Sequence, residues 1–505
     1  MTTSAATVLE LRDRVRRHET TAQSAVADAL RQIDAVDGAI AAVGQVFRDE
    51  ALAAAAAIDR RLASGDAVGP LAGVPFTVKE NIATVEGTTS ASSRILEQHR
   101  SVYDATAVAR LRRAGAVLVA KTNMDEFGMG SSTENSAFHV TRNPWRPTHV
   151  PGGSSGGAAA LSAATRGMIH LGSDTGGSIR QPASYCGVTG FKPTYGRVSR
   201  YGLLAFASSL DQIGALQQSA ADCALALGAI AGEDAMDATS RDAEVPDFVA
   251  LLARGVEGLR IGVPREFFPG GVDAEVRELV EVAVAKLEGL GAEVREVSLP
   301  HVRYANPAYV LVSAAEASSN LARYDGIHCG RRVADPADLI DLYARSRAEG
   351  FGAEVKRRIL IGTFVLSSGY YDAFYRKALQ VRSLVRRDFE RVFADVDAVV
   401  GPTSPVPAFP IGERMDDPMK LYAVDVLTVP ANLAGLPAIS LPCGSTRDGL
   451  PIGLQVHGRA LEDDVVLRLA AAYQSSTDHH ARAPSICAWR SDAAAGSSGT
   501  ARGRS

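Results

Sequence analysis

Two glycine- and serine-rich clusters, residues 151–157 and 172–180, lie close together in the middle of the chain. Residues 158–164, which are rich in alanine, are predicted to form a helix, and the apolar residues 168–171 a strand. Flexible linkers of this composition join domains, whereas these clusters border regular elements. The arrangement therefore predicts two ordered loops inside a folded domain, a common position for reactive side chains.

Predicted strands and helices alternate through the rest of the chain. Helices are predicted at 105–114, 274–290 and 460–473. Strands are predicted at 116–120, 259–263, 398–401, 439–441 and 454–456. Residues 1–66 and about 305–394 are predicted to be mainly helical. Because no internal repeat is visible, we expect one layered α/β domain over 1–483, followed by a flexible tail, 484–505, that is rich in Ser, Ala, Gly and Arg.

Charge and cysteine content exclude several classes of protein. The chain has 53 Lys and Arg residues against 57 Asp and Glu, a net charge of -4, so it is a poor partner for nucleic acid by itself. Its five cysteines form no CxxC pair, which argues against a disulfide framework or structural zinc. Neither a signal peptide nor an apolar stretch of membrane-spanning length is visible. We therefore expect a cytoplasmic protein without a metal site.

The second cluster is the better candidate for a nucleophile. An apolar strand precedes its tetrapeptide Thr175-Gly176-Gly177-Ser178. The glycines allow the backbone to approach a reacting carbonyl group closely. Successive N–H groups of such a turn can form an oxyanion hole, in which each donor is worth about 3–4 kcal/mol to an acyl-transfer transition state. The serine at the end of the turn is then positioned to attack.

The first cluster contains Gly152-x-Ser154-x-Gly156, the spacing of a nucleophile elbow. That match is weak, because an elbow serine follows a buried strand and residues 143–147 cannot form one. A phosphate-binding loop is also disfavoured, since alanine, and not lysine, follows the glycines.

A serine nucleophile needs a base, and two kinds are available. His139, His149 and His170 lie near the clusters, but loop or packing roles suit each of them better. Lys79 ends the strand-like segment 74–81. It is either an ordinary strand-end lysine that reaches solvent or a buried base. A lysine base must be neutral, so its pKa would have to fall by about 3 units.

Together, Lys79, Ser154 and Ser178 resemble the Ser–cisSer–Lys triad of the amidase signature family, and residues 152–193 resemble its signature throughout. Longer segments resemble one branch of that family, the A subunits of tRNA-dependent amidotransferases: 121–127, 130–136, 208–212, 354–359, 367–371 and 427–435. The resemblance implies the amidase signature fold, an α/β fold in which helices cover both faces of a mixed central sheet (α/β/α).

The resemblance also implies a reaction. Neutral Lys79 would take a proton through Ser154, which would sit on a cis peptide bond. Ser178 would attack the side-chain amide of glutamine, with the oxyanion against the backbone of residues 175–178. The released ammonia would pass to a B subunit holding the misacylated tRNA, and a C subunit would complete the heterotrimer. The complex would use ATP and Mg²⁺, while this chain would bind no cofactor or metal.

Tyr309, Arg358 and Asp425 match the glutamine-binding positions of that branch. An arginine for the α-carboxylate and an aspartate for the α-ammonium suit a free amino acid. From the residues alone, simpler roles are favoured. Arg358 would be a surface charge in the basic run 356–358, and Asp425 would be a helix N-cap before 426–428.

Two alternatives remain open from the sequence. One is a free-standing amidase of the same fold that acts on another amide. The other is a non-catalytic scaffold, which the intact triad argues against. Within the leading interpretation, the choice between Glu-tRNA(Gln) and Asp-tRNA(Asn) would lie largely in the partner protein that binds the tRNA.

Overall fold

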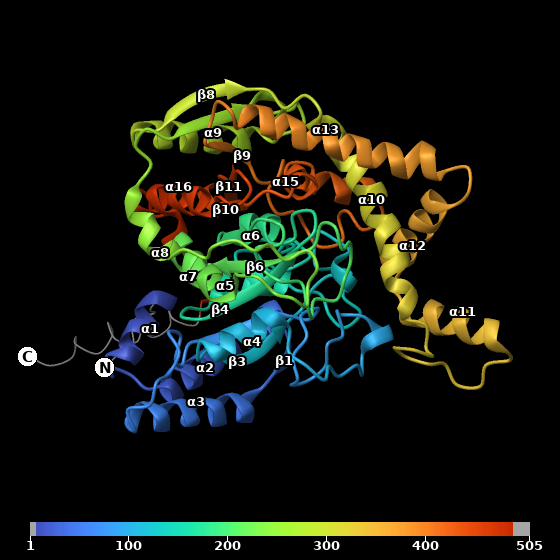
Figure 1. Ribbon diagram of the computed structural model, residues 1–505, viewed down its shortest axis with the longest axis horizontal. Helices are drawn as coiled ribbons and strands as arrows, with labels where there is room; N and C mark the ends of the chain where they lie inside the picture. Colours follow the sequence, from blue (N-terminus) through green and yellow to red (C-terminus); the bar gives the residue numbers. More distant parts are fainter. Residues whose placement is uncertain (1–6, 488–505) are drawn as a thin grey trace, which may run out of the picture.

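A mixed sheet of eleven strands runs through residues 7–487, the part of the chain that the computed structural model describes (Figure 1). The strand order is β1-β3-β2-β4-β6-β5-β10-β11-β9-β7-β8. The bounds of the strands are β1 Val43–Val46, β2 Pro75–Lys79, β3 Val117–Thr122, β4 Ile169–Asp174, β5 Thr189–Lys192, β6 Gln212–Gln217, β7 Arg260–Pro264, β8 Glu293–Val297, β9 Ala398–Pro402, β10 Ala438–Ser445 and β11 Pro451–Gly458.

The α-helices are distributed along the whole described chain. Their bounds are α1 Val8–Arg16, α2 Ala22–Ile40, α3 Arg48–Ala63, α4 Thr106–Arg113, α5 Gly156–Ala164, α6 Arg180–Cys186, α7 Ala220–Ile230, α8 Phe248–Leu251, α9 Ala274–Gly289, α10 Ala305–Asn320, α11 Leu339–Gly350, α12 Ala353–Leu366, α13 Lys377–Val392, α14 Pro418–Tyr422, α15 Val429–Ala434 and α16 Asp463–Ser475. None of the helices in residues 7–487 is long and apolar enough to cross a membrane.

Helices cover both faces of the sheet, as the sequence predicted. Successive side chains of a strand point to opposite faces. On β3, Val117 and Val119 belong to a hydrophobic cluster formed with α2 and α5. Leu118, between them, belongs to a second cluster that includes α4, α7, α9 and α16. The sheet therefore lies between two helical layers and has a hydrophobic core on each side.

Strands β2 and β4 bring the sequence-predicted site residues together. They pair in parallel, with Phe76 opposite Ile169 and Val78 opposite Leu171. Because parallel strands end at the same edge of a sheet, Lys79 at the end of β2 comes beside the loop that follows β4. The second Gly-Ser cluster begins with the last three residues of β4 and continues into that loop.

The N-terminal region contains a strand that the sequence did not predict. Residues 1–66 were expected to be helical, and α1, α2 and α3 lie there, but β1 separates α2 from α3. This strand pairs antiparallel with β3 at the edge of the sheet. Four residues are too few for a periodic pattern, and the pairing depends on β3, which is distant in the sequence.

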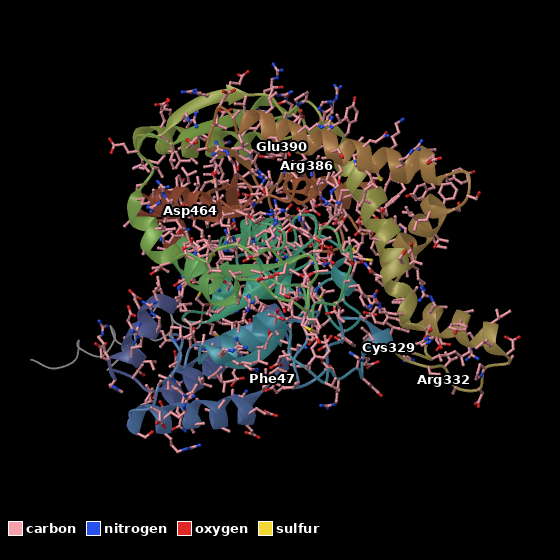
Figure 2. All side chains as sticks on the ribbon, viewed as in Figure 1. Phe47, Cys329, Arg332, Arg386, Glu390 and Asp464 are labelled. Atoms are coloured by element: carbon pink, nitrogen blue, oxygen red, sulfur yellow. The ribbon has the colours of Figure 1, made fainter. Side chains whose placement is uncertain are left out.

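Residues 305–394 are mainly helical, apart from a segment without helix before α11. Helices α12 and α13 both pack on α10, and a π-helix, Tyr371–Arg376, leads into α13. Figure 1 shows α13 along the upper edge of the molecule and α11 projecting to the right. In Figure 2, Arg386 and Glu390 mark α13, and Arg332 lies in the segment before α11.

The predicted flexible tail lies mostly outside the described residues, which end at Cys487. Three of its first four residues, all but the exposed Ser485, pack on the domain. Pro484 and Cys487 are buried, and the Cys487 thiol donates to the carbonyl oxygen of Ala163 at 3.4 Å. Ile486 packs against the hydrophobic cluster that contains α2 and α5.

Candidate active site

Lys79 is fully buried at the end of β2. Its amine donates hydrogen bonds to the Ser154 hydroxyl at 2.7 Å and to the Ser155 hydroxyl at 2.8 Å. A third contact, at 3.3 Å, reaches the carbonyl oxygen of Ser173 on β4. Lys79 is therefore not a strand-end lysine that extends into solvent, and it directly contacts one of its two predicted partners.

Burial lowers the pKa of Lys79 to about 7, from an ordinary value of 10.5. The negative charges of Asp125, Asp174 and Asp211 act in the opposite direction but are outweighed. Near neutral pH, a substantial fraction of Lys79 is therefore the neutral amine, which can accept a proton. This pKa has the direction and approximate size that the sequence analysis required of a lysine base.

The activity of the protein should consequently rise with pH. Below about pH 7, Lys79 is mainly an ammonium ion and cannot accept a proton; above it, the amine is free. We expect kcat/KM for a neutral amide such as propionamide to increase through a midpoint near 7. A pH–rate profile between pH 5.5 and 9 measures this. A flat profile, or one that falls with pH, would show that Lys79 is not the base.

Ser154 and Ser155 lie in the first Gly-Ser cluster, just before α5. The Gly153–Ser154 peptide bond is cis. Ser155, which the sequence analysis did not select, contacts Lys79 and also donates to the carbonyl oxygen of Ser173 at 3.0 Å. The motif contains two adjacent serines, and both reach the lysine. Ser155 is thus a further residue of the site.

Ser178 lies on the loop between β4 and α6. Its carbonyl oxygen accepts a hydrogen bond from the Ser155 N–H at 3.1 Å, so the two Gly-Ser clusters are in contact. The side chain is 7% exposed, while Lys79 and Ser154 are 0% and 1% exposed. Within residues 7–487 the Ser178 hydroxyl has no hydrogen-bond partner. It is the member of the predicted triad that remains available to a substrate.

The loop before Ser178 is held by Asp174, a residue that the sequence analysis did not select. The Asp174 carboxylate accepts the N–H groups of Gly177 at 2.9 Å and Ile179 at 3.2 Å. It also forms a buried ion pair with Arg180. Burial alone would raise the pKa of Asp174, but the charge and hydrogen bonds of Arg180 hold this pKa low, at about 2. Asp174 therefore stays ionised and fixes the turn.

The three residues predicted for the oxyanion hole are not equivalent. Among the described residues, the N–H groups of Thr175 and Gly176 have no acceptor, whereas Asp174 already occupies that of Gly177. The N–H of Ser178 is also free in this part of the chain. In the conformation described, the N–H groups of this turn that remain open to an oxyanion are therefore those of Thr175, Gly176 and Ser178.

Tyr309, Arg358 and Asp425 come from three distant segments: α10, α12 and the 3-10 turn Ala423–Asp425. The Tyr309 ring lies directly against Gly176, because a β-carbon on that glycine would be 2.5 Å from the ring carbon Cζ. A β-carbon on Gly177 would lie 3.3 Å from Asp425 Oδ1. Both side chains thus border the loop that carries Ser178.

Arg358 is only 4% exposed, so it is not the surface charge that its basic neighbours suggested. Its Nε donates to Glu354 Oε1 at 2.7 Å, and its guanidinium lies 4.1 Å from the centre of the Tyr422 ring. Its Nη1 atom is buried and has no hydrogen-bond partner in the described chain. A buried donor without a protein partner is costly, so Arg358 Nη1 is open to a hydrogen bond from outside the chain.

Asp425 is not a helix N-cap, because Thr428 occupies that position before α15. Its Oδ2 accepts a hydrogen bond from the Ser131 hydroxyl, while Oδ1 is buried and has no partner among residues 7–487. Burial raises the pKa of Asp425 to about 8. An ammonium group bound at Oδ1 would lower this pKa again and favour the ionised carboxylate.

Among the hydrogen bonds of residues 7–487, none joins His139, His149 or His170 to the triad. His170 is buried and shares a 2.9 Å hydrogen bond with Thr77, and burial lowers its pKa to about 3. His149 shares a 3.0 Å hydrogen bond with its neighbour Thr148 in a loop. In residues 7–487, no group of three or more His, Cys, Asp or Glu side chains is arranged to hold a metal ion.

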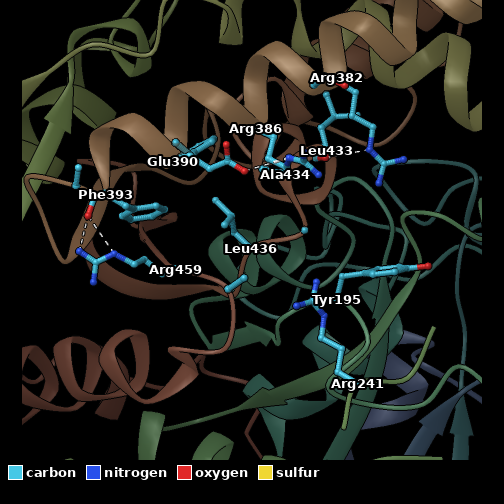
Figure 3. A pocket seen from close by; sticks show the side chains of 15 residues that line it. Tyr195, Arg241, Arg382, Arg386, Glu390, Phe393, Leu433, Ala434, Leu436 and Arg459 are labelled. Atoms are coloured by element: carbon cyan, nitrogen blue, oxygen red, sulfur yellow. Dashed lines mark hydrogen bonds and ion pairs between the residues drawn. The ribbon is translucent and has the colours of Figure 1, made fainter. Parts of the chain in front are cut away.

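A cavity of about 620 Å³ lies elsewhere, beside α13 and the segment 433–436 (Figure 3). No residue predicted for the catalytic or glutamine site lines it. Its arginines largely serve the fold: Arg382 donates to the carbonyl oxygen of Leu433, and Arg459 to that of Phe393. Arg386 pairs with Glu390 at 3.2 Å. This cavity therefore does not compete with the triad as the active site.

The chain is similar to known proteins over most of its length. The family model described as Amidase matches residues 24–467. The chain is 55% identical to the A subunit of the glutamyl-tRNA(Gln) amidotransferase of Moorella thermoacetica, over 95% of this chain and 98% of that one. The crystal structure of the corresponding glutamyl-tRNA(Gln) amidotransferase chain from Thermotoga maritima superposes with a TM-score of 0.78 at 42% identity, covering 94% and 95% of the two chains. That of the peptide amidase from Stenotrophomonas maltophilia superposes with a TM-score of 0.79, at 32% identity over 94% and 97%.

Proposed function

The chain belongs to the amidase family, and on that premise we propose that it is the glutamine-hydrolysing component of a tRNA-dependent amidotransferase. It releases ammonia that converts Glu-tRNA(Gln), Asp-tRNA(Asn) or both into Gln-tRNA(Gln) and Asn-tRNA(Asn). The chain is 55% and 42% identical to two amidotransferase chains but 32% identical to a peptide amidase. The 42% identical amidotransferase structure and the peptide amidase nevertheless superpose on it almost equally well, with TM-scores of 0.78 and 0.79. Identity along the whole chain therefore supports this branch of the family.

The observation that carries the proposal is a pair of buried atoms without partners. Arg358 Nη1 is an unused donor and Asp425 Oδ1 an unused acceptor in the described chain. Asp425 and Tyr309 both border the loop of Ser178, and the charge of Arg358 acts on the pKa of Tyr309. A free amino acid carries a carboxylate for the first atom and an ammonium group for the second. Glutamine adds the side-chain amide that Ser178 attacks.

The hydrogen bond between Lys79 and Ser154 supports the following chemistry. The neutral amine takes the proton of Ser154, which in turn takes the proton of Ser178 as that oxygen attacks the amide carbon. The N–H groups of Thr175, Gly176 and Ser178 stabilise the resulting oxyanion. The C–N bond then breaks, and the proton returns through Ser154 to the departing nitrogen, which leaves as ammonia. A water molecule, deprotonated by the same relay, hydrolyses the ester on Ser178 and frees glutamate.

The ammonia is used on a partner. The amidotransferase relatives are named as one component of an enzyme, which implies a complex of several subunits. We propose a heterotrimer in which a B subunit binds the misacylated tRNA and activates its carboxylate with ATP and Mg²⁺, and a C subunit holds the other two chains together. A net charge of -4 is consistent with a chain that does not itself hold tRNA. Because aminoacylated tRNA is used in the cytoplasm, the proposed activity places the chain there.

Replacing Arg358 with leucine should weaken glutamine hydrolysis selectively. Loss of the contact to the α-carboxylate should cost about 1.5–3 kcal/mol, roughly 10- to 100-fold in kcat/KM. Propionamide has no carboxylate and should change little. Lys356→Leu is the matched control, because Lys356 is an exposed residue of the same helix whose amine contacts a backbone oxygen. Equal losses on both substrates would show that Arg358 is structural.

The proposed function is tested by measuring glutamine hydrolysis by this chain alone and after assembly with the B and C subunits of the same genome. We expect glutamine to be preferred over propionamide, and its hydrolysis to increase when ATP and misacylated tRNA are added. A preference for the neutral amide, with no response to the partners, would favour a free-standing amidase.

A further inference from the structure

A buried glutamine side chain joins the two halves of the site. Gln181 lies on α6, three residues after Ser178, and is 0% exposed. Its Oε1 accepts a hydrogen bond from the N–H of Gly153 at 2.9 Å, and its Nε2 donates to the carbonyl oxygen of Ser131 at 3.1 Å. One amide thus contacts both the first Gly-Ser cluster and the loop that contains Ser131.

The Gly153 end of this connection leads to the proton relay. The next residue is Ser154, whose hydroxyl contacts Lys79 at 2.7 Å. This loop is tightly enclosed. A β-carbon on Gly152 would lie 2.6 Å from Gln181 Oε1, and one on Gly153 would lie 2.1 Å from Asp125 Oδ2. Only glycine leaves room for these close approaches. The Gln181 amide therefore lies directly against the backbone next to Ser154, where it can hold that backbone in place.

The Ser131 end leads to the substrate. The Ser131 hydroxyl donates to Asp425 Oδ2, and the other oxygen of that carboxylate, Oδ1, is the buried acceptor without a partner. Hydrogen bonds and the short covalent segments between them therefore link the carboxylate that would receive an α-ammonium to the Gly152–Gly153 peptide group, one residue before Ser154. Gln181 is the central residue of this connection, and its side chain bonds to neither end, Asp425 or Ser154.

We propose that Gln181 is a positioning residue that couples recognition of the α-ammonium group at Asp425 to the placement of Ser154. This inference rests on the proposed function, since it presumes that glutamine is the substrate. Occupation of Asp425 by an ammonium group fixes Ser131, and Gln181 transmits that order to the backbone beside Ser154. An amide substrate that carries an α-ammonium group therefore has a higher kcat than one that lacks it, in addition to the tighter binding that the ammonium group provides.

The test is Gln181→Met, which keeps the length of the side chain but removes both hydrogen bonds. We expect kcat/KM for glutamine to fall about 10- to 100-fold, and kcat/KM for propionamide to fall several-fold less. Part of the glutamine loss should be in kcat, because Ser154 is misplaced. Gln181→Glu should restore most of the loss, since burial keeps the new carboxyl protonated and its carbonyl and hydroxyl groups can replace the amide.

Gln212→Met is the matched control. Gln212 is also 0% exposed, accepts from the N–H of Gly196 at 2.9 Å and donates to the carbonyl oxygen of Val198 at 2.9 Å. Its backbone pairs with Asp174 in the sheet, but its side chain bonds residues 196 and 198 and no residue of the triad, so its replacement removes the same kinds of bond without touching the triad's own hydrogen bonds. We expect a lower melting temperature and similar effects on the two substrates.

A double-mutant cycle tests the coupling itself. Asp425→Asn should lower kcat/KM for glutamine in both backgrounds. The factor by which it does so should be at least about threefold smaller in Gln181→Met than in the wild type, because the connection is already broken there. Additive effects, or equal losses of Gln181→Met on glutamine and propionamide without rescue by Gln181→Glu, would overturn the inference. Failure of the wild-type complex to hydrolyse glutamine would instead overturn the proposed function, so the two outcomes are distinct.

Discussion

Replacing Ser178 with alanine should abolish glutamine hydrolysis, with a loss on the order of 10⁴-fold or more, because no other group can form the ester intermediate. The fold should be unaffected. The Ser178 hydroxyl makes no hydrogen bond within residues 7–487, so its removal should change the free energy of unfolding by less than about 0.5 kcal/mol.

Two measurements check this expectation: ammonia release with glutamine, and mass spectrometry of the intact chain for the glutamyl adduct. Ser155→Ala is the matched control, since Ser155 also lies at the relay but is not the nucleophile. It should lose part of the rate and still form the adduct. An adduct of normal mass on Ser178→Ala would place the nucleophile elsewhere.

Replacing Lys79 should have the second largest effect. Lys79→Met keeps most of the buried volume but removes the base, and we expect the rate of acylation to fall about 10²- to 10⁴-fold. Lys79→Arg should not restore activity, because a guanidinium group does not give up its proton at working pH. Single-turnover kinetics with glutamine measure the acylation step directly.

A melting curve for each Lys79 variant controls for lost packing, since this side chain is fully buried and holds the Ser154 and Ser155 hydroxyls. An active arginine variant would show that Lys79 supplies only a positive charge. Recovery of the methionine variant by added small amines, with unchanged melting, would further support the role of a base.

The buried layers of the fold could be predicted from the sequence. Strand β3 and helix α4, for example, follow local apolar patterns, and they lie within a few residues of the expected positions. The edge strand β1 could not be predicted, because a four-residue strand has no period of its own. Strand β6 was not predicted either. It is buried on both faces, so its sequence lacks the alternation of apolar and polar residues that marks a half-buried strand.

The site was predictable only in part. Lys79 could be found because an apolar strand ends in a charged residue, and Ser178 because it follows two glycines after a strand. Asp174 could not, since its role depends on Arg180 and on Asn432, whose amide donates to it at 2.8 Å from 258 residues away. The burial of Arg358 likewise depends on packing that only the folded chain creates. For Tyr309, Arg358 and Asp425, the resemblance to a family was the only signal in the sequence.

The central claim is that nitrogen from the glutamine amide reaches tRNA-bound glutamate or aspartate through Ser178. The most direct measurement supplies [amide-¹⁵N]glutamine and excess unlabelled ammonium to the chain assembled with its B and C subunits, ATP, Mg²⁺ and misacylated tRNA. We predict that ¹⁵N appears in the amide of the aminoacyl-tRNA, and that Ser178→Ala removes this label while unlabelled ammonium still supports amidation. Equal incorporation by the wild type and Ser178→Ala, or no incorporation by the wild type, would contradict it.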